Sequence, residues 1–415
     1  MKRICAAAFG ILTLSLFLGA CVQLITPKPD LPPAATATVH VIPPRPIKTS
    51  VPNANATRRA TSTRKASATI TESSTPTASF TITSTSTSTF TLTPSPTPSA
   101  TITVTATITL SPTAFYGAVP TLFPMSIVAM RHGSYPGSEI KLDEELAEGA
   151  NYRRYYVYYL SQGLKIYALL TVPDGEMPAD GWPGIIFNHG YIPPSEYRTT
   201  ERYINYVDRL ARQGYVVFRI DYRGHGNSEG TAQGAYGDPG YEVDVLNAIA
   251  SLKRYPLVNP NKIGMWGHSM GGYLTLRSMV ISHDVKVGVI WAGVVGSYAD
   301  ILEKWPNGLS DEQAISRKWM DDWPTEFGTP DENPAFWNSI SANNYLADLS
   351  GPIQLHYGTN DEEVPPQFSE TLASEINQAD GNVEIYAYPG DNHNLSNYFN
   401  PAMDRTIEFF DSILK

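Results

Sequence analysis

A serine lies among closely spaced glycines in the segment that starts at Gly267 and reads Gly-His-Ser-Met-Gly-Gly. The pattern Gly267-x-Ser269-x-Gly271 follows a short apolar run, 263–266, and precedes a stretch of helical periodicity that starts at Met270. Glycine weakens both strands and helices, so a cluster at their junction indicates a backbone forced into a sharp turn. A serine on such a turn has its hydroxyl exposed for attack on a carbonyl carbon. We therefore predict that Ser269 is the nucleophile of an acyl-transfer reaction.

A serine hydroxyl needs a general base, and the base needs an acid that orients it. When the serine lies on a strand-to-helix elbow, the acid and then the histidine follow it along the chain. His393 comes just after the last apolar run, and Asp361 lies in the loop that leaves the run before it. Asp391 is the rival acid, but it is only two residues from His393. We predict that Asp361 and His393 complete a triad, and we interpret Glu362 and Glu363 as solvated loop charges.

The tetrahedral intermediate of acyl transfer also needs hydrogen-bond donors for its oxyanion. One predicted donor is the backbone N–H of Met270, the residue after the nucleophile. The other is the N–H of Tyr191, in the loop 188–193 that follows an earlier apolar run. These two amides would form the oxyanion hole.

Other polar residues near the expected site have a structural interpretation. We interpret His189, His225 and His268 as hydrogen-bonded scaffold rather than as proton carriers, and Arg223 with Asp221 as a structural pair. No combination of side chains has the spacing of a zinc site. We therefore predict that the protein uses no metal and no other cofactor.

Apolar runs alternate with amphipathic stretches over residues 126–415, the pattern of a mostly parallel sheet covered on both faces. The runs expected as strands are 155–160, 165–172, 184–187, 215–220, 263–266, 285–291, 352–356 and 383–388. The stretches expected as helices are 201–213, 241–254, 367–378 and 403–414. We predict an eight-stranded α/β sheet in which the first two strands form an antiparallel hairpin.

The region from Tyr152 to Lys415 resembles the catalytic domain of the prolyl oligopeptidase-like (S9-type) serine hydrolases. It is also similar to dienelactone-hydrolase-like and acyl esterase relatives within the α/β-hydrolase superfamily. The stretches that carry the resemblance are 221–229 (Asp-Tyr-Arg-Gly-His-Gly-Asn-Ser-Glu), 244–249, 267–272, 358–365 and 388–393 (Tyr-Pro-Gly-Asp-Asn-His). The resemblance implies an α/β-hydrolase fold and the cleavage of ester or peptide bonds.

Two departures from the family pattern limit what the resemblance implies about substrates. Many relatives have His-Gly-Gly at the oxyanion loop, whereas this chain has His189-Gly190-Tyr191. Oligopeptidases of the family also carry a β-propeller that admits only short peptides, whereas here a low-complexity segment precedes the catalytic region. Short-peptide and ester substrates therefore both remain open, as does a third hypothesis, an inert hydrolase fold that serves as a binding module.

The alternation of strands and helices breaks between residues 297 and 346, where this superfamily often inserts a lid. The aromatic residues of this segment are Trp305, Trp319, Trp323, Phe336, Trp337 and Tyr345. Such rings either line an apolar pocket or form the small core of the lid itself. We predict a helical lid insertion, and we expect at least half of the rings to form its core.

The first 20 residues have the basic start and apolar run of a bacterial secretion signal. They lead into Leu18-Gly-Ala-Cys21, which resembles the lipobox of bacterial lipoproteins and implies cleavage before Cys21 and a lipid on that cysteine. The alternative is an uncleaved signal-anchor helix, because the run approaches the ~20 residues that span a bilayer. Both interpretations predict an extracytoplasmic protein held at the cell membrane.

Residues 21–125 are rich in Thr, Ser, Pro and Ala, without a recurring apolar period, so we predict a disordered tether. The two cysteines, Cys5 and Cys21, leave the mature chain without an internal disulfide. The formal net charge of -10, without a long basic run, argues against nucleic acid as a partner. The predicted organisation is a signal peptide (1–20), a tether (21–125) and a catalytic domain (126–415) with its lid at about 297–346.

Overall fold

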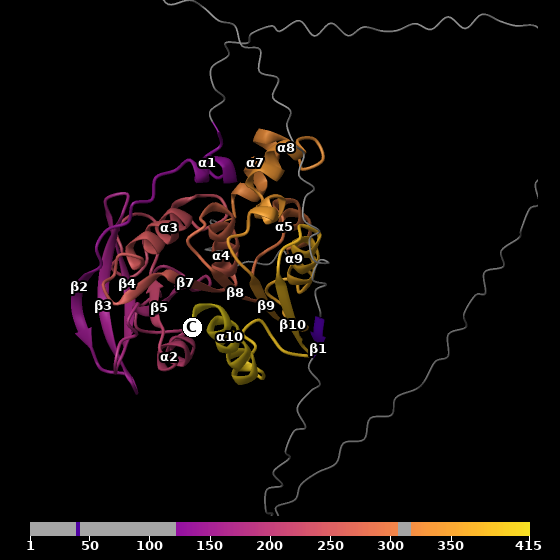
Figure 1. Ribbon diagram of the computed structural model, residues 1–415. Coiled ribbons are helices and arrows are strands. Elements are labelled where there is room, and N and C mark those ends of the chain that lie inside the picture. Colours follow the sequence, from indigo (N-terminus) through magenta and orange to yellow (C-terminus); the bar gives the residue numbers. More distant parts are fainter. Residues whose placement is uncertain (1–38, 42–121, 306–316) are drawn as a thin grey trace, which may run out of the picture. The chain divides into compact units, whose positions relative to one another are not determined.

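The computed structural model of the protein describes residues 39–41, 122–305 and 317–415 (Figure 1). The predicted signal peptide, Cys21 and nearly all of the predicted tether lie outside these residues. Within the described part, no helix is both long and apolar enough to cross a membrane.

Ten strands form one sheet in the order β1-β10-β9-β8-β7-β5-β6-β4-β3-β2. The strands are β1 Val39–Val41, β2 Lys141–Leu146, β3 Tyr152–Ser161, β4 Leu164–Pro173, β5 Trp182–Asn188, β6 Val216–Ile220, β7 Val258–His268, β8 Val287–Trp291, β9 Ile353–Gly358 and β10 Val383–Tyr388. Pairing is parallel from β1 to β6 along this order and antiparallel among β6, β4, β3 and β2. The sheet is therefore mostly parallel, as predicted.

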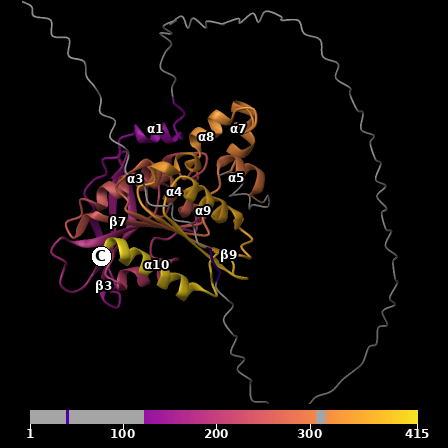
Figure 2. The same ribbon diagram turned by 45° about the vertical axis from the view of Figure 1, so that its right-hand side comes forward.

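Helices cover both faces of the sheet. They are α1 Ile127–Arg131, α2 Ile204–Arg212, α3 Gly240–Leu252, α4 Met270–Ile281, α5 Tyr298–Lys304, α7 Trp319–Phe327, α8 Pro334–Ile340, the 3-10 helix η1 Ala342–Asp348, α9 Gln367–Gln378 and α10 Phe399–Leu414. Helices α3, α4 and α9 pack on one face, and α2 and α10 on the other (Figures 1 and 2). The α/β-hydrolase fold expected from the sequence is present.

The central strands are buried on both sides, which explains their mostly apolar sequences. Every residue of β6, β8 and β9 is buried. The buried Leu274 of α4 lies in the core on one face, and the buried Phe410 of α10 lies in the core on the other. These two cores hold the sheet in place from both faces. The carboxyl ends of its strands therefore give firm support to the loops that follow β5, β7, β9 and β10.

The sheet has two more strands than predicted, both at its edges. Strand β2 reads Lys-Leu-Asp-Glu-Glu-Leu and its residues are almost all exposed, so it lacks the apolar run by which strands were recognised. Strand β1 comes from the range predicted as a disordered tether and pairs with β10. Phe123, also in that range, packs edge-on against Trp323 of the lid, with ring centroids 5.3 Å apart. The folded domain therefore starts before residue 126.

The segment predicted as a lid contains α5, α7, α8 and most of η1, and Figure 1 shows α7 and α8 side by side at one end of the domain. Trp319, Trp323 and Trp337 are buried, and the rings of Phe327 and Phe336 stack 4.2 Å apart. The aromatic rings of this segment therefore pack against one another, but their cluster is continuous with the core on the face covered by α3, α4 and α9.

Candidate active site

The turn between β7 and α4 holds Ser269 in a strained backbone conformation, with φ 55° and ψ −119°. Two glycines make this turn possible. A Cβ at Gly267 would lie 2.2 Å from the carbonyl oxygen of Gly271, and a Cβ at Gly271 would lie 2.0 Å from that of Asn188. Side chains at either position would collide with backbone, so the glycine spacing noted in the sequence is a steric requirement of the turn.

Met270 is the first residue of α4, so its N–H has no partner within the helix. The N-terminus of a helix carries partial positive charge, which favours an anion at this position. The preceding amide, that of Ser269, donates to the carbonyl of Trp291 at 3.0 Å and anchors the turn to β8. The turn therefore presents the serine hydroxyl and an adjacent amide donor at the carboxyl edge of the sheet.

A cavity of about 560 Å³ lies beside Ser269. Its wall includes four residues predicted for the site: Ser269, Met270, Tyr191 and His393. The other lining residues are Gly190, Ile192, Arg202, Tyr203, Tyr206, Gly234, Ala235, Tyr236, His268, Trp305, Arg317, Glu362, Glu363, Val364 and Asn394. Loops that are far apart in the sequence thus line the same cavity.

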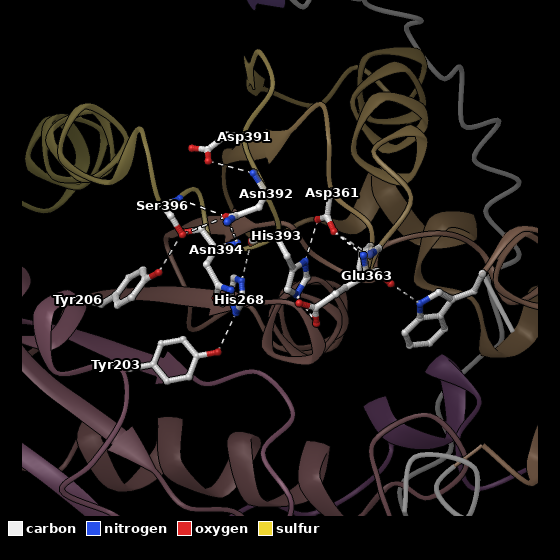
Figure 3. Close-up of polar contacts among 12 residues, drawn as sticks. Tyr203, Tyr206, His268, Asp361, Glu363, Asp391, Asn392, His393, Asn394 and Ser396 are labelled. Carbon is white, nitrogen blue, oxygen red and sulfur yellow. Dashed lines mark hydrogen bonds and ion pairs between the residues drawn. The ribbon is translucent and has the colours of Figure 1, made fainter. Parts of the chain in front are cut away.

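Asp361 and His393 form a close hydrogen-bonded pair (Figure 3). The distance between His393 Nδ1 and Asp361 Oδ2 is 2.8 Å, and both side chains are nearly buried. The other carboxylate oxygen of Asp361 accepts the backbone N–H groups of Glu363 and Val364, each at 2.9 Å. These amides fix the carboxylate, and the carboxylate fixes the ring of His393 with Nε2 left for proton transfer.

Ser269 and His393 line the same cavity, yet no hydrogen bond joins their side chains within the described residues. Such bonds are often long in unliganded enzymes and tighten only when a substrate binds. The carboxylate of Glu363 lies 3.9 Å from His393 Nε2 and is 67% exposed. Glu363 is therefore a solvent-exposed charge, as expected from the sequence, but it lies at the edge of the cavity.

Asp391, the rival acid, is buried and engaged elsewhere. Its carboxylate accepts the backbone N–H groups of Asn392, Asn397 and Tyr398 and the side-chain amide of Asn397. All these donors come from the loop after β10, so Asp391 shapes the loop that carries His393.

The neighbouring histidines lie in hydrogen-bonded and stacked positions. His189 and His225 are buried, and burial lowers the pKa of His189 well below its usual value and that of His225 to about 4. Arg223 and Asp221 have structural contacts, as expected, but with other partners than each other: the carboxylate of Asp221 accepts from the hydroxyl of Tyr197 at 2.6 Å. Arg223 instead forms a bidentate ion pair with Asp244 at 2.7 and 3.0 Å, because both groups lie beside the start of α3.

Several residues of the cavity wall could not be recognised as site residues from the sequence. Tyr203, Tyr236 and Arg317 belong to no motif, and the chain fold alone brings them to Ser269. Tyr203 contacts His268, with Oη 2.7 Å from Nδ1 (Figure 3). A tyrosine at the start of an amphipathic helix gives no indication that its hydroxyl lies in a site.

A serine elbow on an α/β-hydrolase sheet, beside a histidine–carboxylate pair, defines the class of the serine hydrolases. Residues 202–415 match the model of the prolyl oligopeptidase family, and the chain belongs to this family.

Among relatives, the chain is 27% identical over 259 residues to the "Uncharacterized peptidase YtmA" of Bacillus subtilis (strain 168), a match that covers 61% of this chain and 90% of that protein. It is 26% identical over 251 residues to the "Uncharacterized peptidase YuxL" of the same organism, where the match covers 59% of this chain and only 36% of the relative. The chain therefore corresponds to nearly all of one relative and to about a third of the other.

Two solved structures share the fold. The acetyl xylan esterase from Paenibacillus sp. R4 aligns with a TM-score of 0.53 at 19% identity, covering 68% of this chain and 92% of that one. The acylaminoacyl peptidase of Pyrococcus horikoshii aligns with a TM-score of 0.52 at 22% identity, covering 64% of this chain and 42% of that one. Esterases and peptidases thus share this architecture, and the fold by itself does not separate their substrates.

Proposed function

We propose that the protein is an exported, lipid-anchored serine hydrolase that cleaves carboxylic ester or short-peptide bonds through Ser269, His393 and Asp361. The observation that carries the proposal is the 2.8 Å bond between His393 Nδ1 and Asp361 Oδ2, beside a cavity that Ser269 and His393 both line. Membership of the prolyl oligopeptidase family supports the same chemistry.

In the proposed mechanism, Oγ of Ser269 attacks the carbonyl carbon of the substrate while Nε2 of His393 takes its proton. Asp361 holds the imidazole in the required tautomer and stabilises the imidazolium that forms. The N–H groups of Met270 and Tyr191 bind the oxyanion of the tetrahedral intermediate. His393 then protonates the leaving group, and a water molecule activated by the same histidine releases the acyl group from Ser269. No step needs a cofactor.

The cavity wall supports a substrate with both an apolar and a polar part. Tyr236 and Trp305 supply aromatic surface, and the Arg317 guanidinium carbon lies 3.2 Å from the centre of the Trp305 ring. Burial lowers the pKa of Arg317 to about 10. An oxygen of the substrate would gain a charge-assisted hydrogen bond from this guanidinium.

Ester and peptide substrates can be separated by kcat/KM. Purified protein would be assayed on short-chain nitrophenyl esters and on aminoacyl and prolyl anilides, beside a Ser269→Ala control. Fast ester turnover with negligible anilide cleavage would identify a carboxylesterase without peptidase activity, which is the alternative function. Comparable anilide turnover would identify a peptidase. Both activities should fall by several orders of magnitude in the control, because the nucleophile is lost.

An inert binding module is the alternative from another class. A fluorophosphonate probe tests it directly, because the probe modifies only an activated serine. Labelling of the folded protein that disappears in Ser269→Ala supports the hydrolase. An unlabelled but folded protein would favour the binding module.

The lipid anchor and the extracytoplasmic location rest on the sequence around Cys21. The test is the incorporation of a radiolabelled fatty acid in a bacterial host that processes lipoproteins, with Cys21→Ala as the control. We expect a labelled, membrane-associated protein whose label is lost in the variant. Membrane association without label would instead favour the uncleaved signal-anchor helix.

A further inference from the structure

A line of hydrogen bonds crosses the carboxyl edge of the sheet beside Ser269, and Figure 3 shows its part from Tyr203 through His268 to His393. The N–H of Gly190, in the loop after β5, is 3.0 Å from the hydroxyl oxygen of Tyr203. That oxygen is 2.7 Å from Nδ1 of His268, and Nε2 of His268 is 3.0 Å from the backbone carbonyl oxygen of His393. The line thus joins the loop with the predicted oxyanion donor to the loop that carries the predicted base.

The direction of every hydrogen bond in this line follows from the groups involved. The carbonyl oxygen of His393 can only accept, so Nε2 of His268 carries a proton. Burial, with a contribution from His393, lowers the pKa of His268 to about 3, so the ring is neutral and its Nδ1 is an acceptor. Tyr203 therefore donates to His268, and its oxygen remains free to accept from Gly190. All three donors and all three acceptors are matched.

The close approach at Gly190 depends on the absence of a side chain. A Cβ there would lie 2.7 Å from the Tyr203 oxygen and 3.2 Å from both Nδ1 of His268 and Cβ of Ser269. Gly190 thus lies directly against the nucleophile turn and the two linking side chains. Any other residue would push the loop away from Ser269.

The backbone that delivers Tyr203 is strained. Arg202 and Tyr203 both have a left-handed conformation, with φ 48° and 53°, which is unfavourable for non-glycine residues. The buried guanidinium of Arg219 holds this segment by donating to the carbonyls of Glu201 at 2.9 Å, Arg202 at 2.5 Å and Thr199. Strain of this kind persists where the surrounding structure enforces it, and it is concentrated at functional sites.

We propose that Tyr203 and His268 are positioning residues that lock the oxyanion loop and the His393 loop into one catalytic geometry. The inference rests on the proposed function, since it assigns these residues to the same reaction. Neither side chain transfers a proton to substrate. Their role is to keep His393 Nε2 and the loop amides in register with Ser269, where a 1 Å displacement can cost about 10²-fold in rate.

The test is the Tyr203→Phe variant, which removes the donor to His268 and the acceptor for Gly190 while it keeps the ring. We expect kcat on a nitrophenyl ester to fall about 10- to 100-fold with KM changed less than about threefold. The downfield proton resonance of His393 Nδ1–H, bonded to Asp361, should broaden or move. Tyr215→Phe is the matched control, because it removes a hydroxyl bonded to Asp411 far from the cavity and should leave kcat unchanged.

Two variants of His268 keep the test decisive if Tyr203→Phe does not fold. His268→Gln retains one donor and one acceptor, and His268→Leu retains neither, so kcat should be at least tenfold higher in the first than in the second. Equal kcat in the two, or wild-type kinetics and an unmoved resonance in a folded Tyr203→Phe, overturns the inference. Fluorophosphonate labelling of the wild type distinguishes a failure of this inference from a failure of the proposed function. A reactive Ser269 leaves only the positioning role refuted, whereas an unreactive Ser269 refutes the proposed function and the inference with it.

Discussion

The Asp361→Asn substitution changes one atom, and the structure dictates how the new amide must lie. Two backbone N–H groups, those of Glu363 and Val364, donate to one carboxylate oxygen of Asp361, and His393 Nδ1 contacts the other. In the asparagine variant the amide oxygen stays with the two N–H donors. The new NH₂ group must therefore face Nδ1 of His393.

This orientation reverses the tautomer of His393. An NH₂ group facing Nδ1 requires a lone pair there, so the single proton of the neutral ring moves to Nε2. Nε2 then has no lone pair to accept the proton of Ser269. The same substitution in a well-studied serine protease lowers kcat by about 10⁴-fold for this reason. We expect a loss of that order here, which corresponds to about 5 kcal/mol of transition-state stabilisation.

The assay is kcat for ester hydrolysis, together with the melting temperature to verify folding. Asp391→Asn is the matched control, because the carboxylate of Asp391 accepts from residues 392–398 of its own loop, and the amide oxygen of the variant can keep the bonds from Asn392 and Asn397. It should lower the melting temperature and keep kcat within about tenfold of the wild type. Activity of Asp361→Asn within tenfold of the wild type would refute the reasoning. A kcat loss in Asp391→Asn that equals the loss in Asp361→Asn would refute the choice between the two acids.

Three further predictions concern stability, measured by urea unfolding. Gly271→Ala should cost about 3 kcal/mol and most of the activity, since the new Cβ would lie 2.0 Å from the Asn188 carbonyl oxygen; wild-type stability would contradict this. Arg277→Met should cost about 3–5 kcal/mol, because it leaves the fully buried Glu242 unpaired, and adding Glu242→Leu should recover much of the loss. Burial lowers the pKa of His225 to about 4, so the native state binds fewer protons than the unfolded state between pH 4 and 6.5. Stability should therefore fall by about 3 kcal/mol from this group as pH drops through that window, and a parallel pH curve in His225→Phe would refute it.

The sequence predicted those parts of the fold that follow from local pattern. Eight strands have apolar runs because at least part of each strand is buried, and α9 coincides with its predicted range, 367–378. Strand β2 was missed because an exposed edge strand needs no apolar face, and its charged residues protect the edge from other chains. A buried strand can be recognised by its apolar residues, whereas an exposed edge strand has no such pattern in the sequence.

The candidate site could be predicted from the sequence where its residues belong to a motif, and could not where only long-range contacts bring them together. Ser269 stands in a motif whose glycines are sterically required, and Asp361 and His393 follow it in the order that the topology imposes. Tyr203 reaches the site only through the long-range contact with His268, and Arg219 holds the segment before Tyr203 by its bond to the carbonyl of Arg202. No spacing rule connects Tyr203 with His268, 65 residues further on, so only the folded chain reveals their contact.

The start of the folded domain gives the last prediction. The composition up to residue 125 resembles that of the tether, yet Phe123 packs against Trp323, Phe327 and Phe336 with ring centroids 5.1–5.4 Å apart. Phe123→Ala should therefore destabilise the protein by about 2–3 kcal/mol, somewhat less than for a fully buried phenylalanine. Leu122→Ala is the control, because Leu122 is 46% exposed and should change stability by less than about 0.5 kcal/mol.

Equal urea midpoints for the two variants would mean that the segment before residue 126 adds nothing to the fold. The structure argues otherwise, because Arg277 of α4 donates to the carbonyl of Met125 at 2.7 Å and to that of Ile340 in the lid. One buried side chain thus ties the helix that starts beside Ser269 to both the lid and the first folded residues. A loss of Phe123 should therefore loosen the lid as well, and KM should rise more than kcat falls, because the lid contributes Trp305 to the cavity wall.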